Sequence, residues 1–198
     1  MTKLYSILFE GQYVYHNSPD PNIEYFAPRK FMHNADYSES GKYVEGEEVP
    51  EGMEVSELVF ATDENMNPFY SLPRDVPRVM VDDYESIDAI LRAYPSLRGV
   101  VEEGKQNLIL DLKDMDAAQN YSWTQYAFDK DEYRFKPASD GEYVTNMVVK
   151  PTSVTIMRNP LKAIKESPGW KVTFVPDLKD LHRMLTSSGL PYNAENLG

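Results

Sequence analysis

The chain alternates short runs of β-branched and aromatic residues with dense clusters of turn-forming residues. Residues 12–16 (Gln-Tyr-Val-Tyr-His) form one such run, and residues 17–21 (Asn-Ser-Pro-Asp-Pro) end it. Branched and aromatic side chains suit a pleated sheet, whereas Pro, Asn and Asp favour turns. The pattern predicts further strands at 57–62, 78–82, 107–112, 132–136, 142–150, 153–157 and 170–175, with a hairpin turn at 137–141.

Few segments show helical spacing. A helix is predicted to begin at Asp82 or Asp83, because apolar residues recur at three- and four-residue intervals after it, and Pro95 ends it near Tyr94. Further helical segments are predicted at 178–185, ending near Gly189, and at 161–166. Strands dominate and do not alternate regularly with helices. We therefore expect an α+β fold formed by a single domain, residues 1–198.

The composition excludes several classes of protein. The 198 residues are 41% hydrophobic and contain no cysteine, so neither a disulfide framework nor a thiolate metal site is expected. No apolar run is long enough to cross a bilayer, and the N-terminus does not resemble a secretory signal. We expect a cytoplasmic protein that has no membrane partner.

The net charge is −12, and it is unevenly distributed. Residues 36–64 contain ten acidic residues and one basic residue, whereas residues 150–183 contain seven basic and three acidic residues. A strongly acidic chain is repelled by phosphates, which argues against general nucleic-acid binding. The Gly- and Pro-rich stretch at 36–56 is predicted to be a solvated acidic loop. Its alternative role is to occupy a basic, nucleic-acid-binding groove of a partner protein, as an acidic phage or mobile-element protein would.

Common catalytic motifs are missing. There are three histidines, His16, His33 and His182, and no two of them have the spacing of metal ligands on one helix. Neither a phosphate-binding glycine loop nor a Gly-x-Ser-x-Gly nucleophile motif occurs. His16 differs from the other two because it ends a predicted strand, where a scaffold presents polar groups to a cleft. The alternative is a turn histidine bonded to neighbouring backbone.

Three segments, in order, resemble the ADP-ribosyltransferase-like superfamily. Residues 15–18 (Tyr-His-Asn-Ser), followed by Pro28-Arg29, are similar to its first strand. Residues 59–62 (Val-Phe-Ala-Thr), with Phe69-Tyr70-Ser71 after them, resemble its aromatic-x-Ser/Thr strand. Asp140-Gly141-Glu142 resembles its acidic-x-Glu element, with Asp140 where Glu or Gln is commoner.

This resemblance implies two small packed β-sheets with a few peripheral helices, and NAD bound in a cleft between the sheets. The first strand, with Tyr15, would contribute His16 to the ribose on the nicotinamide side, and Thr62 would support the strand that lines the cleft. Glu142 would orient a ribose hydroxyl and stabilise the cationic sugar of the transition state. Tyr70 would stack on nicotinamide, with Phe69 and Tyr84 as alternatives, and Arg29 would contact the pyrophosphate.

Two functional hypotheses follow. In the first, the protein is an NAD-dependent transferase that attaches ADP-ribose to a macromolecular acceptor, more often a protein than a nucleic acid; glycohydrolase or phosphotransferase chemistry would use the same cleft. In the second, it is a non-enzymatic acidic protein that blocks a basic surface of a partner. The first depends on Glu142 and the second does not.

Overall fold

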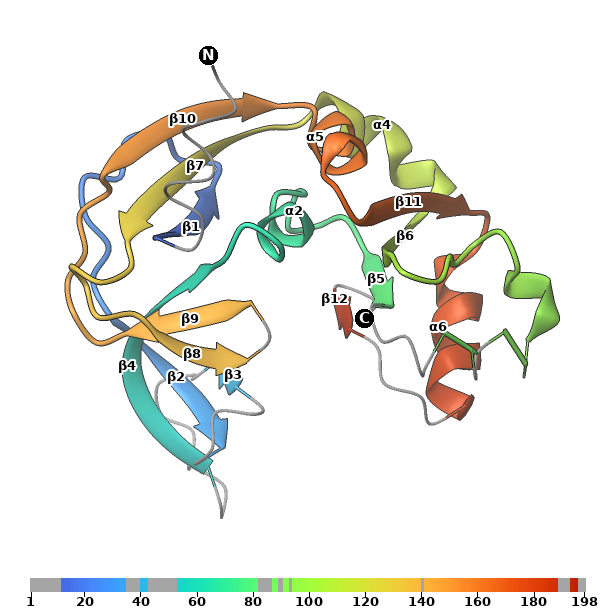
Figure 1. The fold of residues 1–198 in the computed structure, drawn as a ribbon, viewed down its shortest axis with the longest axis horizontal. Helices are drawn as coiled ribbons and strands as arrows, with labels where there is room; N and C mark the ends of the chain where they lie inside the picture. The colour runs from blue at the N-terminus through green and yellow to red at the C-terminus, as the bar shows by residue number, and fades with distance from the viewer. Residues whose placement is uncertain are drawn as a thin grey trace. The chain divides into compact units, whose positions relative to one another are not determined.

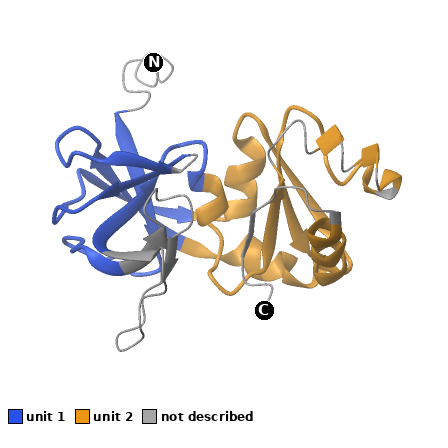
Figure 2. Ribbon diagram, turned by 90° about the horizontal axis from the view of Figure 1, so that it is seen from below, with its two compact units in different colours: residues 1–67, 123–157 blue, residues 68–122, 158–198 orange. Residues whose placement is uncertain are grey.

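The computed structural model describes residues 12–34, 40–42, 53–81, 87–88, 91–92, 94–139, 141–188 and 193–195. Its strands form two sheets, of eight and of four strands, accompanied by a few short helices. The α+β class expected from the sequence is therefore confirmed. The chain divides into two compact units: unit 1 comprises Met1–Asn67 and Trp123–Met157, and unit 2 comprises Pro68–Ser122 and Arg158–Gly198 (Figure 2).

The larger sheet belongs mainly to unit 1 and has the strand order β10-β7-β1-β4-β2-β3 (Figure 1). Strand β9 pairs with β4 as well, and β8 pairs with β9. The bounds are β1 Tyr13–Ser18, β2 Arg29–Asn34, β3 Ser40–Lys42, β4 Met53–Thr62, β7 Ser122–Asp129, β8 Lys136–Ser139, β9 Glu142–Thr145 and β10 Ser153–Arg158. Because β4 bonds to β1, β2 and β9, its register decides which residues of those strands are neighbours.

Aromatic residues fill the core of unit 1. Val14 of β1 is buried beside Phe128, its partner on β7. The ring of Phe26 meets those of Tyr126 and Phe128 at centroid distances of 5.0 and 5.2 Å, both edge to face. Such edge-to-face contacts add to the stabilisation that burial of the rings provides. Strand β7 contributes much of this core, although no strand was predicted there.

The strand predicted at 132–136 is wrong, because a turn occupies residues 130–134. Asp129 ends β7, and its Oδ1 accepts the backbone N–H groups of Asp131 and Glu132, both at 3.0 Å. An aspartate that bonds the following backbone in this way stabilises a turn in competition with a strand. The hairpin begins only afterwards, with β8, and its turn near Gly141 is close to the predicted position.

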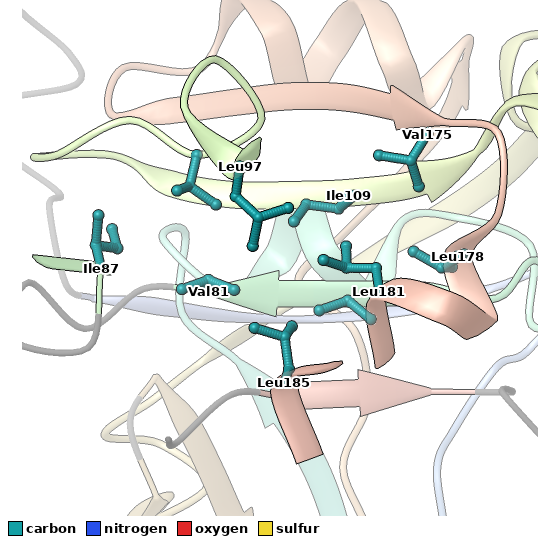
Figure 3. Close-up of a cluster of buried hydrophobic side chains, with 10 residues drawn as sticks. Val81, Ile87, Leu97, Ile109, Val175, Leu178, Leu181 and Leu185 are labelled. Atoms are coloured by element: carbon teal, nitrogen blue, oxygen red, sulfur yellow. The ribbon is translucent and has the colours of Figure 1, made fainter. Parts of the chain in front are cut away.

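The smaller sheet belongs to unit 2 and has the order β11-β6-β5-β12. Its strands are β5 Arg78–Val81, β6 Gln106–Asp111, β11 Trp170–Val175 and β12 Asn193–Glu195. Strand β11 is parallel to β6, whereas β5 is antiparallel to both β6 and β12. Figure 3 shows α6 packing onto this sheet, with Leu181 and Leu185 close to Val81 and Ile109.

Helix α6, Leu178–Ser188, confirms the helix predicted near the C-terminus, and α5, Pro160–Glu166, confirms the shorter one. Residues 87–88 and 91–92 are helical, in agreement with the helix predicted after Asp82 or Asp83. The helices α2 Asn67–Tyr70 and α4 Met115–Asn120 and the 3-10 turns η1 Pro95–Leu97 and η2 Leu112–Asp114 were not predicted.

The turn at Asp129 makes the stability of unit 1 dependent on pH. The pKa of Asp129 lies below its usual value because the N–H of Glu132 favours the carboxylate; burial opposes this, and Gln12 and Asp131 add to the lowering. A lowered native pKa stabilises the fold above the unfolded-state value of about 3.9, and this stabilisation is lost as pH falls through the native value. Asp129→Asn should lower the free energy of unfolding by about 1 kcal/mol at pH 7, a small loss because solvent screens the partly exposed charge, and by less at pH 3.

Urea unfolding of the wild-type protein and of Asp129→Asn, each at pH 7 and at pH 3, measures the loss of unfolding free energy at the two pH values. Glu103→Gln removes an exposed carboxylate elsewhere and should not change stability at either pH. An equal loss at pH 3 and pH 7 for Asp129→Asn would show that the carboxylate charge is not the cause.

Candidate functional site

Three of the predicted site residues form one row across neighbouring strands. Tyr15 of β1 is paired with Thr62 of β4, and Thr62 is paired with Glu142 of β9. Residues paired across antiparallel strands point to the same face of the sheet. Tyr15, Thr62 and Glu142 therefore share a face, with the outer two about 10 Å apart at two strand spacings. We call these three residues the Tyr15–Glu142 row.

Thr62 lies at the centre of the row and is buried. Its hydroxyl donates a hydrogen bond to the Tyr15 carbonyl oxygen at 3.4 Å, which adds a side-chain link between β4 and β1. Tyr15 and Glu142 are half-buried on either side of Thr62.

Glu142 owes its position to the glycine before it. Gly141 has a φ of +70°, and its carbonyl oxygen accepts the N–H of Asp63 at 2.8 Å. A Cβ atom at Gly141 would lie 2.2 Å from Cγ of Met66, so any other residue would clash as well as be strained. The hairpin therefore fits closely onto the chain that leaves β4, and β9 starts with Glu142 opposite Thr62.

His16 points to the other face of the sheet, because it follows Tyr15 on a regular strand. Its Nδ1 lies 3.1 Å from the Phe60 carbonyl oxygen, and its ring centroid lies 4.8 Å from that of Phe26. His16 is thus next to the aromatic core, whereas Glu142 shares a face with Tyr15. The sequence led us to expect His16 and Glu142 at one site. The strand register places these two residues on opposite faces of the sheet, and Tyr15 instead shares the face of Glu142.

Arg29 is exposed at the start of β2, opposite Leu58 of β4. Leu58 and Thr62 are four residues apart on β4, so Arg29 shares a face with the Tyr15–Glu142 row. Four residues of strand correspond to roughly 13 Å, a separation that the long arginine side chain can shorten. Among the predicted ligand contacts, Arg29 is therefore placed on the side of the sheet where an anion bound at the row would lie.

The aromatic residues proposed for nicotinamide belong to unit 2. Tyr70 is half-buried at the end of α2, and its ring meets that of Phe69 at 5.1 Å. Phe69 itself is buried, with the Arg78 guanidinium 5.0 Å from its ring centroid, so it serves the core.

Tyr84 and Asp140 lie outside the described residues, as does most of the acidic loop predicted at 36–56. Its described parts, residues 40–42 and 53–56, belong to β3 and β4.

The environment of Tyr15 keeps its phenol protonated. Burial raises the pKa of Tyr15, and the nearby carboxylate of Glu64 and the phenol of Tyr13 raise it further. At neutral pH the side chain is therefore a neutral aromatic ring with a hydroxyl donor. Such a group can stack on a planar ligand or donate a hydrogen bond to a sugar.

A small cavity of about 90 Å³ lies beside this end of the sheet. Tyr13, Asp63, Lys130 and Tyr143 are among the residues that line it, and the Lys130 ammonium lies 4.1 Å from the centroid of the Tyr143 ring. Sequence reasoning missed these residues. Lys130 follows β7, which was not predicted, so nothing in the sequence indicated that it would lie next to β9.

Comparison of the sequence with known protein families identifies one to which the chain belongs. The chain belongs to a family of unknown function, DUF6886, which matches residues 15–197. No curated protein matches the chain. No solved structure matches it either. The DUF6886 match includes the whole Tyr15–Glu142 row and most of both units, but the family carries no activity that could be transferred to these residues.

Two further findings concern the described part of the chain. None of its helices is long and apolar enough to cross a membrane. It also holds no group of three or more His, Cys, Asp or Glu side chains arranged to bind a metal ion.

Gly141→Ala tests how closely Glu142 is positioned. Gly169 is the matched control, because it also has a positive φ, +86°, but no atom lies within 4 Å of the position of its Cβ. Gly169→Ala should lose about 1 kcal/mol of unfolding free energy through backbone strain alone. Gly141→Ala should lose about 3 kcal/mol, because the clash with Met66 is added to the same strain. If urea unfolding shows equal losses for Gly141→Ala and Gly169→Ala, the Met66 side chain moves aside at no cost in stability.

Proposed function

We propose that the chain binds NAD over the Tyr15–Glu142 row and transfers ADP-ribose to a macromolecular acceptor. One observation supports this proposal: Tyr15, Thr62 and Glu142 come from three separate sequence segments and lie side by side on one face of three adjacent strands. These are the segments that resemble the conserved strands of ADP-ribosyltransferase-like proteins. A carboxylate, a hydroxyl and an aromatic ring in one row form a small polar site with an aromatic wall.

Glu142 would act on the bond between nicotinamide and its ribose. As this bond breaks, its electron pair leaves with neutral nicotinamide, and positive charge develops on the ribose carbon. A fixed carboxylate stabilises charge that appears only in the transition state, which increases the rate rather than the affinity. An acceptor nucleophile then bonds to the same carbon and loses its proton; if water takes its place, the reaction is hydrolysis.

The remaining residues would bind and orient. The neutral phenol of Tyr15 suits the nicotinamide ribose or ring, and the Arg29 guanidinium, on the same face, suits the pyrophosphate in shape and charge. Thr62 would hold β1 and β4 together beneath the ligand. His16 would not contact the ligand, because it lies on the opposite face, where its Nδ1 is 3.1 Å from the Phe60 carbonyl oxygen. We propose a protein as the acceptor, because the acidic chain repels nucleic acid.

Replacement of Glu142 separates catalysis from binding. Glu142→Gln keeps the size of the side chain and removes its charge, so nicotinamide release should fall by about 100-fold or more. The NAD dissociation constant should change by less than about threefold, because the lost interaction belongs to the transition state. Chromatography of released nicotinamide and calorimetric titration with NAD measure the two effects.

The control is Glu24→Gln, which removes an exposed carboxylate of unit 1 and should leave both quantities unchanged. Absence of NAD binding to the wild-type chain would refute the proposal. Salt-sensitive capture of a basic protein, unaffected by Glu142→Gln, is the result expected if the chain is instead an acidic blocking protein.

A second pair of variants tests the face assignment. Tyr15→Ala removes a ring next to Thr62 and should weaken NAD binding about tenfold. His16→Gln, on the opposite face, should change the dissociation constant by less than about threefold. The same titration measures both variants, with thermal unfolding to confirm that each is folded. A larger loss of binding in His16→Gln than in Tyr15→Ala would place the ligand on the other face.

A further inference from the structure

Unit 2 contains a cavity of about 330 Å³ between α4, α5 and β11. None of its residues belongs to the Tyr15–Glu142 row. Its lining includes Met115, Gln119, Asn159, Lys162, Lys165 and Phe174. Pockets of a few hundred cubic ångströms, with apolar walls and a few polar groups, are typical of small-molecule sites. The chemistry of this lining is specific enough to indicate a class of ligand.

The apolar part of the lining suits a flat ring. Met115 is 37% exposed at the start of α4, and Phe174 is half-buried on β11. Both expose surface that burial under a ligand would remove from water. A thioether and a phenyl ring are favourable neighbours for an aromatic ligand, since sulfur–aromatic and aromatic–aromatic contacts add to the apolar gain.

The charged part of the lining is mainly cationic. The Lys165 ammonium lies 5.9 Å from the centroid of the Phe174 ring, so a cation stands beside the aromatic surface. Lys162 and Glu166 form an exposed ion pair at 3.8 Å, and Glu166 also lines the cavity. An exposed pair of this kind contributes little energy, so Lys162 can turn to an anionic ligand at small cost. The two lysines against one carboxylate leave the lining positive.

Asn159 adds a hydrogen-bond donor in an unusual backbone conformation. Its φ is +55°, and its Oδ1 accepts the N–H of Lys162 at 3.0 Å, which caps α5. In the described part of the chain, no hydrogen bond engages its Nδ2. Residues held in the left-handed region are concentrated at ligand sites, and the cap fixes the amide at the cavity. The lining thus offers an amide donor in addition to the two ammonium groups.

We propose that this cavity binds a planar aromatic anion. The ring would lie against Phe174 and Met115, and the anionic group would interact with Lys162 and Lys165, with the Asn159 amide as a further donor. An aromatic carboxylate and a nucleoside monophosphate share this chemistry. An aromatic cation would be repelled by the two lysines. An aliphatic anion would leave the apolar surface of Phe174 and Met115 exposed to water.

Titration of the 198-residue chain with four probes tests the proposal and separates the two ligand sources. Benzoate and benzamide differ mainly in charge, as do adenosine monophosphate and adenosine. At least one of the two anions should give saturable NMR shift changes at Asn159, Lys165 and Phe174, with an affinity at least tenfold above that of its neutral counterpart. Saturation by benzoate alone identifies a carboxylate site, and saturation by the monophosphate identifies a nucleotide site.

Variants locate the binding. Lys162→Gln and Lys165→Gln should each weaken binding about threefold to fivefold, and Phe174→Leu, which keeps an apolar side chain, about fivefold. Lys179→Gln is the matched control, because Lys179 is an exposed lysine of the same unit that does not line this cavity. Binding should be unchanged in the control and in Glu142→Gln. Equal affinity for the charged and neutral probes, or an equal effect of Lys179→Gln and Lys165→Gln, would overturn the proposal.

Discussion

The candidate site depends on the register of β4. This strand pairs with β1 and β9 at the same residue, Thr62, so one backbone position aligns Tyr15 on one side and Glu142 on the other. Side chains alternate along a strand, so a slip of one residue in either pairing would turn one of these groups to the opposite face. The contact that prevents a slip at β9 is local: Asp63 donates to the Gly141 carbonyl, and Gly141 packs against Met66. A hairpin turn thus positions the carboxylate.

Much of the strand content was predictable, because runs such as residues 12–16 and 170–175 have side chains that suit a sheet and ends that suit turns. The register was not predictable, because it depends on which distant strands pair. The sequence therefore placed Tyr15 and His16 together near Glu142, whereas alternation on β1 allows only one of them to share its face. Strand β7 was missed because polar Ser, Thr and Gln interrupt it, although Tyr126 and Phe128 are central to the core. The segment after it was misassigned because the hydrogen bonds of Asp129 override strand propensity.

Tyr15, and not His16, shares a face with Glu142, and this determines the chemistry of the row. An imidazole titrates near neutral pH and could serve as a base or a cation. The phenol of Tyr15, whose pKa is raised by burial, keeps one form over the whole physiological range. The row therefore has a single carboxyl group, that of Glu142, and binding by its aromatic member should not vary with pH. This division suits a reaction in which a fixed carboxylate stabilises a transient cation and the other groups orient the sugar.

Both proposed ligands are anions, although the chain has a net charge of −12. At physiological ionic strength, charges are screened over about 8 Å, so the groups next to a ligand matter more than the total. Each proposed site has a cation on its own side: Arg29 at the start of β2, on the face of the Tyr15–Glu142 row, and Lys162 and Lys165 on α5. The lysines of α5 come from the basic segment 150–183, well separated in sequence from the acidic residues of 36–64. The groups beside each ligand, rather than the net charge of the chain, therefore decide whether an anion can be held there.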